Sequence, residues 1–354
     1  MTVGSRQELK EKAVEDIDIE TLDLHRPFVD NIHLRGEDGS IYTRVPDVMD
    51  VWFDSGAMPF AQNHYPFENQ EKFKNLFPAD FISEGIDQTR GWFYTLMAIS
   101  TMYKGVAPYK NVLSNDLVLD KEGKKMSKSK GNTLDPFEMF DKYGADAVRF
   151  YSIYVSPAWI PTKFDEDGVR EVEAKLFRTY RNIYSFFQLY AETDAIDPTS
   201  FFVDYEDRQE IDRWLISKYN SLIDYYNKEM AMFEYTNVAR AISEFLVEDF
   251  SNWYIRRNRR RFWQSEINED KKSVYNTTYE VLLGVTKLLA PIIPFTTEEM
   301  YHNLTDGESV HLEMLPELDE SLIDEKLEEK MDLVRKIVTL GRSSREDAGI
   351  KVRQ

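Results

Sequence analysis

The stretch Gly123-Lys124-Lys125-Met126-Ser127-Lys128-Ser129-Lys130-Gly131-Asn132 sets several ammonium groups on a short segment bracketed by two glycines. Lysine is a compact point charge with three donors, which suits charge that moves between phosphate oxygens during a reaction. The serines between the lysines add small donors without bulk. The segment therefore predicts a mobile, phosphate-binding loop. The plain alternative is a solvated, lysine-rich surface loop.

The flanks of this lysine loop favour the phosphate-binding interpretation. Residues 112–119 are β-branched and apolar enough for a strand, and Asp120 to Gly123 read as the turn that follows. Downstream, Asp135 is expected to cap a helix, with Pro136 at its first position and Glu138 closing a capping box. A strand, a cationic loop and a capped helix together form a frame for phosphate chemistry.

Length and composition limit the class of protein. With 354 residues, 42% hydrophobic and 30% charged, the chain predicts a globular protein of two or three domains. No apolar run approaches the roughly 18 residues of a membrane span, and the first twenty residues do not resemble a signal peptide. We expect a cytoplasmic protein. The absence of cysteine excludes disulfides and thiolate zinc sites, and the five histidines show no metal-ligand spacing, so we assign no metal.

The net charge of −19 argues against a protein that simply coats nucleic acid. Contact with RNA then requires local basic patches on an acidic body. Two patches qualify: the lysine loop at 121–130 and the arginine run at 256–261.

The chain is predicted to be α/β followed by all-α. Residues 1–45, with turn signals at 36–39, read as a hairpin or linker region, and 46–165 alternate short apolar runs with helix patterns. A connecting helical region (166–205) and a helical domain (206–354) follow. In the helical domain, we expect a proline break at 291–294 to separate two helices, and a last helix to run from about Asp324 to Arg342. A further helix is predicted from an apolar face, which is formed by Trp214, Leu215, Leu222, Ile223 and Tyr226.

Three motifs in order carry a resemblance to a known family. Residues 125–129 are letter for letter the second signature of class I aminoacyl-tRNA synthetases. With the segments 50–56 and 83–94 before them, they closely resemble the isoleucyl-tRNA synthetases, whose catalytic domain has a Rossmann-like fold. Further counterparts extend the resemblance over nearly the whole chain; they lie at 212–214, 249–257, 290–295 and 350–354.

The resemblance implies roles for residues around an aminoacyl-adenylate. Glu84 would hold the α-ammonium of the amino acid, and Gly85 would let the backbone approach the adenylate. Asp87 and Gln88 would bind its ribose and carbonyl. Each has a plainer interpretation, because Glu84 also suits a surface or capping carboxylate and 87–89 also suit the start of a helix through Tyr94.

The resemblance also implies an amino-acid pocket and an ATP site. Trp52 and Trp92 would form the two aromatic walls of the side-chain pocket, although most tryptophans are simply core residues. Lys125 and Lys128, with Lys128 foremost, would stabilise the pyrophosphate leaving group. The rest of the ATP-binding loop would be Met126, Ser127 and Ser129.

The arginine run is expected to contact tRNA. In the family this region lies in the tRNA-binding helical domain, and four arginines share one helical face by spacing: Arg256, Arg257, Arg260 and Arg261. The alternative is pairing inside a helical bundle with acids such as Glu244, Glu248 and Asp249.

One family feature is missing. Class I synthetases carry a His-x-Gly-His signature, but no two histidines here stand three apart. We therefore expect a fragment that begins near the end of the inserted editing domain, lacks the amino-terminal half and is inactive alone. The implied parent enzyme is monomeric and joins L-isoleucine to tRNA(Ile) with ATP and Mg²⁺. Two alternatives stay open, a valine or methionine relative and a non-catalytic tRNA-binding module.

Overall fold

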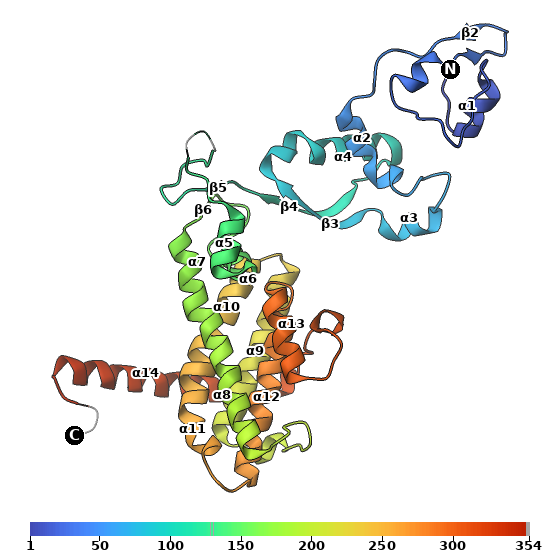
Figure 1. Ribbon diagram of the computed structural model, residues 1–354. Coiled ribbons are helices and arrows are strands. Elements are labelled where there is room, and N and C mark those ends of the chain that lie inside the picture. Colours follow the sequence, from blue (N-terminus) through green and yellow to red (C-terminus); the bar gives the residue numbers. More distant parts are fainter. Residues whose placement is uncertain (128, 130, 352–354) are drawn as a thin grey trace. The chain divides into compact units, whose positions relative to one another are not determined.

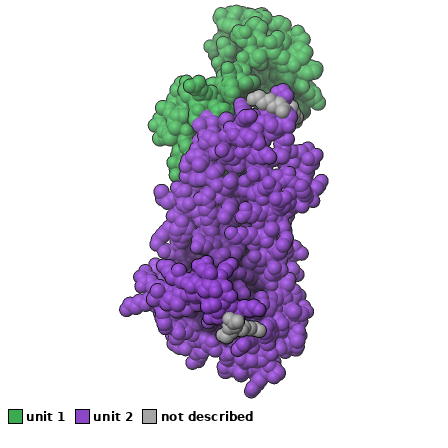
Figure 2. Space-filling view, turned by 90° about the vertical axis from the view of Figure 1, so that its left-hand side faces the viewer, with its two compact units in different colours: residues 1–82, 87–112 green, residues 83–86, 113–354 purple. Residues whose placement is uncertain are grey.

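The computed structural model describes residues 1–127, 129 and 131–351. They form two compact units, one of residues 1–82 and 87–112 and one of residues 83–86 and 113–354 (Figure 2). Lys128 and Lys130 lie outside the described residues.

The first unit contains a hairpin, as the turn signals at 36–39 predict. Strands β1 (Leu34–Arg35) and β2 (Ile41–Tyr42) pair antiparallel, and Gly39 between them has a φ of 79°, which glycine adopts without strain. The other elements of residues 1–112 are α1 (Arg6–Lys12), the 3₁₀ helices η1 (Phe28–Asn31) and η2 (Ile86–Arg90), α2 (Val51–Ala61), α3 (Gln70–Leu76) and α4 (Trp92–Lys104), and the strands β3 (Ala79–Gly85) and β4 (Tyr109–Asn115), which continue past the unit's limits.

Helices α2 and α4 pack against each other and form the centre of the first unit (Figure 1). Gly56 of α2 lies so close to α4 that a Cβ there would stand 2.6 Å from the carbonyl oxygen of Thr95. Phe60, Phe93 and Leu96 are buried at this contact, between 2% and 7% exposed. The glycine therefore sets how closely the two helices approach.

The strand predicted at 112–119 is two strands. Strand β4 ends at Asn115 and pairs with β3, whereas β5 (Val118–Leu119) pairs in parallel with β6 (Thr162–Lys163). The break falls at Asp116, whose carboxylate accepts from the amide of Leu117 and whose own amide donates to the carbonyl of Ala158. Because of these bonds, the backbone at Asp116 does not continue the pairing of β4 with β3. The prediction of a single strand over 112–119 is therefore wrong.

The second unit continues as a bundle of helices (Figure 1). Helix α12 (Glu269–Leu289) packs on α8 (Arg178–Asp194) and α9 (Glu210–Ala231), and these two helices pack on the π-helical segment η6 (Phe245–Ile255). Trp214, Phe250 and Tyr275 are buried in this core. Its helices are α5 (Pro136–Tyr143), α6 (Ala145–Tyr154), α7 (Glu166–Val172), η4 (Glu173–Phe177), α8 (Arg178–Asp194), η5 (Tyr205–Asp207), α9 (Glu210–Ala231), α10 (Tyr235–Glu244), η6 (Phe245–Ile255), α11 (Arg256–Phe262), α12 (Glu269–Leu289), α13 (Pro294–Leu304), η7 (Val310–Leu312), η8 (Glu320–Leu322) and α14 (Glu325–Asp347).

The helix predictions for this unit are confirmed. All five apolar residues predicted for one face of α9 are buried, between 0% and 7% exposed. Helices α12 and α13 are separated at Leu289 and Pro294, and Asp324 caps α14 by accepting from the amide of Leu327. The α/β elements followed by a helical region also agree with the predicted fold class. Among the described residues, no helix has both the length and the apolar character needed to cross a membrane.

Candidate functional site

The lysine loop lies between β5 and α5 in the second unit. Its base is a short hairpin, in which Leu119 pairs antiparallel with Lys125 and the amide of Asp120 donates to the carbonyl of Lys124 at 2.9 Å. Gly123 and Gly131 both have positive φ, 81° and 64°. The two glycines thus provide the turns that the sequence predicts at either end, and Lys125 is exposed between them.

Two side chains tie the base of the loop together. The Asp120 carboxylate, only 8% exposed as a residue, accepts from the backbone amide of Lys124 and from the Asn132 side-chain amide, both at 2.7 Å. Asn132 also donates to the carbonyl of Lys125 at 3.3 Å and accepts from the amide of Ser127 at 2.9 Å. We call this pair the Asp120–Asn132 clasp. The sequence predictions missed it, although Asn132 is the last residue of the quoted stretch and Asp120 lies three positions before its first residue.

Downstream of the loop, α5 begins at Pro136 as predicted, but among the described residues the Glu138 side chain forms no hydrogen bond with the Asp135 amide, so the predicted capping box is not formed. Asp135 caps it by accepting from the amide of Phe137 at 2.8 Å, and Pro136 occupies the first position. The loop is therefore bounded by a paired strand before it and a capped helix after it.

In the first unit, the structure brings together three of the residues predicted at the adenylate and the amino-acid pocket. Gln88 accepts from the amide of Trp92 at 2.9 Å and donates to the Asp87 carboxylate at 3.2 Å. The Trp52 ring lies over Gly91, because a Cβ at Gly91 would stand 2.9 Å from its Cη2 atom. Residues 87–90 lead directly into α4, which agrees with the plainer interpretation of a helix start.

The two tryptophans differ in exposure. Trp52 is 44% exposed, whereas Trp92 is half-buried and lines a small cavity of about 60 Å³ with Met58, Ile82 and Leu96. Trp52 is therefore a surface ring rather than a core residue of this unit. Gly91, which the sequence predictions did not single out, is what allows the ring to pack on the backbone.

Glu84 and Gly85 end strand β3. The Glu84 side chain is exposed, and one carboxylate oxygen accepts from the amide of Gly85 at 3.0 Å. This local bond turns the carboxylate toward its own backbone, while its exposure keeps it within reach of a further donor.

The arginine run forms helix α11, and four of its guanidinium groups are exposed: Arg256, Arg257, Arg259 and Arg260. We call these the arginine surface; Arg259 was not among the predicted residues. Among the described residues, none of the four forms an ion pair, and Arg257 stacks over the ring of Trp253 at 4.7 Å. Asp249, an acid considered as a partner, pairs with Arg335 instead. The structure thus gives no support to pairing of these four arginines inside the bundle.

Arg261 corrects the predicted set. It is 7% exposed, and its two terminal nitrogens donate to the two oxygens of buried Asp212, each at 2.7 Å. It also pairs with Asp270 at 2.8 Å. Because i and i+1 residues face different sides of a helix, Arg261 is turned into the core while Arg260 faces solvent. Arg261 is a core ion-pair residue and does not belong to the arginine surface.

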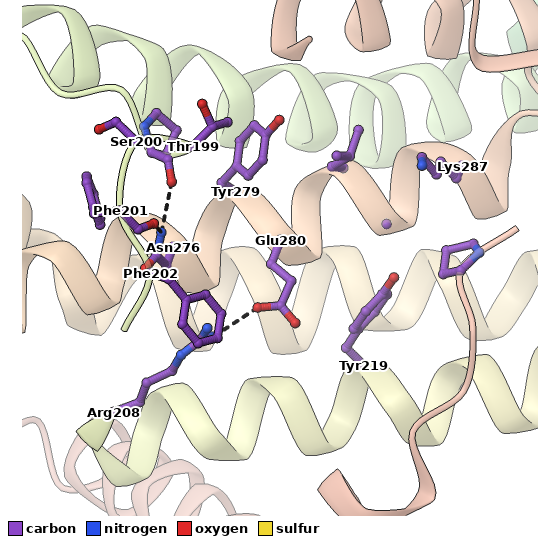
Figure 3. Close-up of a pocket in the computed structure, with 14 residues that line it drawn as sticks. Thr199, Ser200, Phe201, Phe202, Arg208, Tyr219, Asn276, Tyr279, Glu280 and Lys287 are labelled. Carbon is purple, nitrogen blue, oxygen red and sulfur yellow. Dashed lines mark hydrogen bonds and ion pairs between the residues drawn. The ribbon is translucent and has the colours of Figure 1, made fainter. Parts of the chain in front are cut away.

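A cavity of about 730 Å³ lies in the second unit, between the segment 198–208, α9 and α12 (Figure 3). Its charged groups are already paired: Arg208 with Glu280 at 3.0 Å, and Lys287 with Glu313 at 2.6 Å. The Asn276 side chain donates to the carbonyls of Pro198 and Phe201 and so holds the covering segment. The predicted site residues that the structure describes all lie away from its lining. In the described ranges, no cluster of three or more His, Cys, Asp or Glu has metal-binding geometry.

Two protein-family models match the sequence of this chain. The family described as tRNA synthetases class I (I, L, M and V) matches residues 2–163, and the anticodon-binding domain of tRNA ligase matches residues 212–354. The chain belongs to the class I tRNA synthetases.

Among its relatives, the chain is similar to the isoleucine--tRNA ligase of Porphyromonas gingivalis, with 50% identity over 94% of this chain and 30% of the relative. It is 48% identical to the isoleucine--tRNA ligase of Clostridium tetani over 99% of this chain and 34% of the relative. The chain thus spans about a third of the length of these curated relatives.

Two solved structures share the fold. One is the agnB2 LeuRS of Agrobacterium radiobacter K84 in a ternary complex with tRNA and LeuAMS, with a TM-score of 0.64, 21% identity and coverage of 82% of this chain and 36% of that one. The other is the methionyl-tRNA synthetase of Mycobacterium tuberculosis in complex with methionyl-adenylate, with a TM-score of 0.57, 21% identity and coverage of 73% and 51%.

Proposed function

We propose that this chain is part of an enzyme that activates L-isoleucine with ATP and transfers it to tRNA(Ile). The observation that carries the proposal is the 50% and 48% identity to isoleucine--tRNA ligases over 94% and 99% of the chain. Residues 1–354 would supply the lysine loop, the pocket walls and a tRNA-binding helical region. The enzyme's remaining parts, including a His-x-Gly-His signature, would complete the ATP site.

In the activation step, the amino-acid carboxylate displaces pyrophosphate from the α-phosphorus of ATP and forms an aminoacyl-adenylate. Lys125 and Lys128 would stabilise the negative charge that gathers on the leaving pyrophosphate, with Mg²⁺ accompanying ATP. Ser127, Ser129 and the backbone at Met126 would complete the phosphate contacts. This chemistry relies on positioning and charge and requires no covalent protein intermediate.

The amino acid would be bound by groups with complementary chemistry. Trp52 and Trp92 would contact the branched aliphatic side chain, for which flat rigid rings are suitable surfaces. Glu84, an exposed acceptor, would bind the α-ammonium, while Asp87 and Gln88 would bind the adenylate.

The arginine surface would bind the tRNA backbone. Exposed guanidinium groups on an acidic protein are suited to phosphate, and each phosphate contact contributes to the salt dependence of binding. Filter binding of tRNA(Ile) at several salt concentrations tests this. Replacing Arg256, Arg257 and Arg260 with alanine should reduce the slope of log K against log[salt] by about 2 to 3. An unchanged slope would place tRNA elsewhere on the protein.

The test of activity uses a chimera in which residues 1–354 replace the matching third of the Clostridium tetani enzyme. We expect isoleucine-dependent pyrophosphate exchange, with valine a much poorer substrate, and its loss in Lys128→Ala. Lys110→Ala is the matched control, since Lys110 is exposed and its ion pair is with Asp80, at 2.6 Å. A chimera that binds tRNA but exchanges no pyrophosphate would favour the alternative, a non-catalytic tRNA-binding module.

A further inference from the structure

The Asp120–Asn132 clasp joins the two ends of the lysine loop through side chains that carry no assigned role. Asp120 directly follows Leu119, the last residue of β5. The carbonyl of Leu119 accepts from the amide of Phe164 at 2.9 Å, so the position of the aspartate is fixed. Asn132 follows Gly131, the second positive-φ turn of the loop. We propose that Asp120 and Asn132 are positioning residues that hold Lys125 in the geometry required for amino-acid activation; this rests on the function proposed above.

The hydrogen bonds show how the clasp would act on Lys125. The Lys125 carbonyl accepts from the Asn132 side chain, the amide of Lys124 before it donates to Asp120, and the amide of Ser127 after it donates to Asn132. The backbone is therefore fixed on both sides of the lysine, while its ammonium group remains exposed.

Fixing the backbone matters because of how charge stabilisation works. An ammonium group lowers a barrier most when it is in place before charge develops, and a misplacement of about 1 Å can cost on the order of 100-fold in rate. The bond between Asp120 and Asn132 joins a charged acceptor to an amide, which is stronger than a neutral pair. The bond is partly buried, since Asp120 is 8% exposed and Asn132 is half-buried. A strong, partly buried bond at the loop base is suited to this task.

Aspartate and asparagine have the same shape and differ only in a carboxylate oxygen that is replaced by an amide nitrogen. The residues at 120 and 132 can therefore be exchanged in a swap experiment. Asp120→Asn leaves one acceptor oxygen for the two donors that Asp120 binds, and Asn132→Asp would face two carboxylates toward each other, so each single variant removes at least one of the 2.7 Å bonds. The double variant Asp120→Asn with Asn132→Asp restores one donor and one acceptor in reversed order and keeps acceptors for the amides of Lys124 and Ser127. The Lys125 carbonyl loses its donor in the double variant, so the swap restores only part of the clasp. Glu122→Gln is the matched control, because it removes one carboxylate from the same turn without touching the clasp.

The variants are compared in two measurements. Hydrogen exchange of the Lys124 and Ser127 amides in the 354-residue chain reports the clasp itself. Steady-state pyrophosphate exchange in the chimera reports its effect on activation. We expect each single variant to speed amide exchange and to lower kcat by about 10- to 100-fold, with KM for isoleucine within about twofold, and the swap to recover part of both.

The outcomes separate the clasp from the proposed function. If the unmodified chimera is active and the single variants keep its kcat, the clasp has no positioning role. The proposal would also be overturned if the single variants did not change the exchange rates of the Lys124 and Ser127 amides. If the unmodified chimera exchanges no pyrophosphate, the proposed activity fails, and the inference that rests on it fails too.

Discussion

Neighbouring arginines at the end of α11 have opposite environments, and this leads to a stability prediction. Asp212 is fully buried and accepts from Arg261, from the Tyr254 hydroxyl at 2.7 Å and from the Ser273 hydroxyl at 2.7 Å. Arg261→Met would leave this carboxylate buried without its counter-charge. We expect the free energy of unfolding to fall by about 3–5 kcal/mol, measured by urea denaturation.

Arg260→Met is the control for that measurement. Arg260 is exposed and, within the part of the chain that the structure describes, forms no ion pair, so we expect a change within about 0.5 kcal/mol. Equal losses from both substitutions would contradict the burial of Arg261. The sequence could not separate these residues, because a run of arginines gives no sign of which one faces a buried aspartate that lies about fifty positions earlier.

Gly91 carries a second prediction. A Cβ at this position would stand 2.6 Å from the Gln88 side-chain oxygen and 2.9 Å from the Trp52 ring. Gly91→Ala should therefore displace the ring that we propose as a pocket wall and lower kcat/KM for isoleucine by at least about tenfold in the chimera, because positioning contributes strongly to rate. Binding of tRNA should not change.

Gly341→Ala is the matched control for Gly91→Ala. Gly341 lies in α14, where a Cβ would have no described atom within 4 Å, so the substitution should leave isoleucine activation unchanged. Activity retained in Gly91→Ala would show that Trp52 is not a pocket wall.

The loop between β5 and α5 should respond to acid in a defined way. Hydrogen bonds from the Lys124 backbone and the Asn132 side chain lower the pKa of Asp120. A carboxyl with a lowered pKa stabilises the folded state above its unfolded pKa of about 3.9, and this stabilisation is lost as pH falls through the folded-state pKa. We expect the clasp to stay closed from neutral pH to about pH 4 and to open below it.

The side-chain amide signals of Asn132 in NMR measure this opening, while circular dichroism follows the whole chain. The midpoint should lie below about 3.9 and should be absent in Asp120→Asn. A midpoint at or above about pH 4 would show that the clasp is not formed in solution.

Regular elements could be predicted from the sequence where the signal is local. The Asp135 cap, the proline break before α13 and the start of α14 depend on a few adjacent residues, and all are found. The break between β4 and β5 was missed because Asp116 bonds to Ala158, a distant residue. The clasp was missed for a similar reason: its two members lie twelve positions apart, and only the folded hairpin brings them together. Lys128 and the adenylate contacts of Glu84, Asp87 and Gln88 remain predictions.

The buried hydrophobic residues are distributed unequally between the two units. The extended hydrophobic core lies entirely within residues 147–327 of the second unit, with Trp214, Leu215 and Phe250 fully buried. In the first unit the buried residues form smaller groups, such as Phe60, Phe93 and Leu96. Since stability depends on apolar area removed from water, we expect the first unit to unfold at lower urea concentration than the second.

Hydrogen exchange with mass spectrometry in rising urea assigns the two transitions to residues. Leu96→Ala, at a site 2% exposed, should shift only the first transition, and Leu215→Ala, at a site 0% exposed, only the second. Each substitution should cost about 2–5 kcal/mol, because it removes buried methyl groups and leaves a cavity. If both variants instead shifted one common transition, the units would unfold as a single cooperative body. The smaller core of residues 1–82 and 87–112 would then depend on the helical bundle for its stability, and variants of Trp52 or Gly91 would have to be interpreted against the stability of the whole chain.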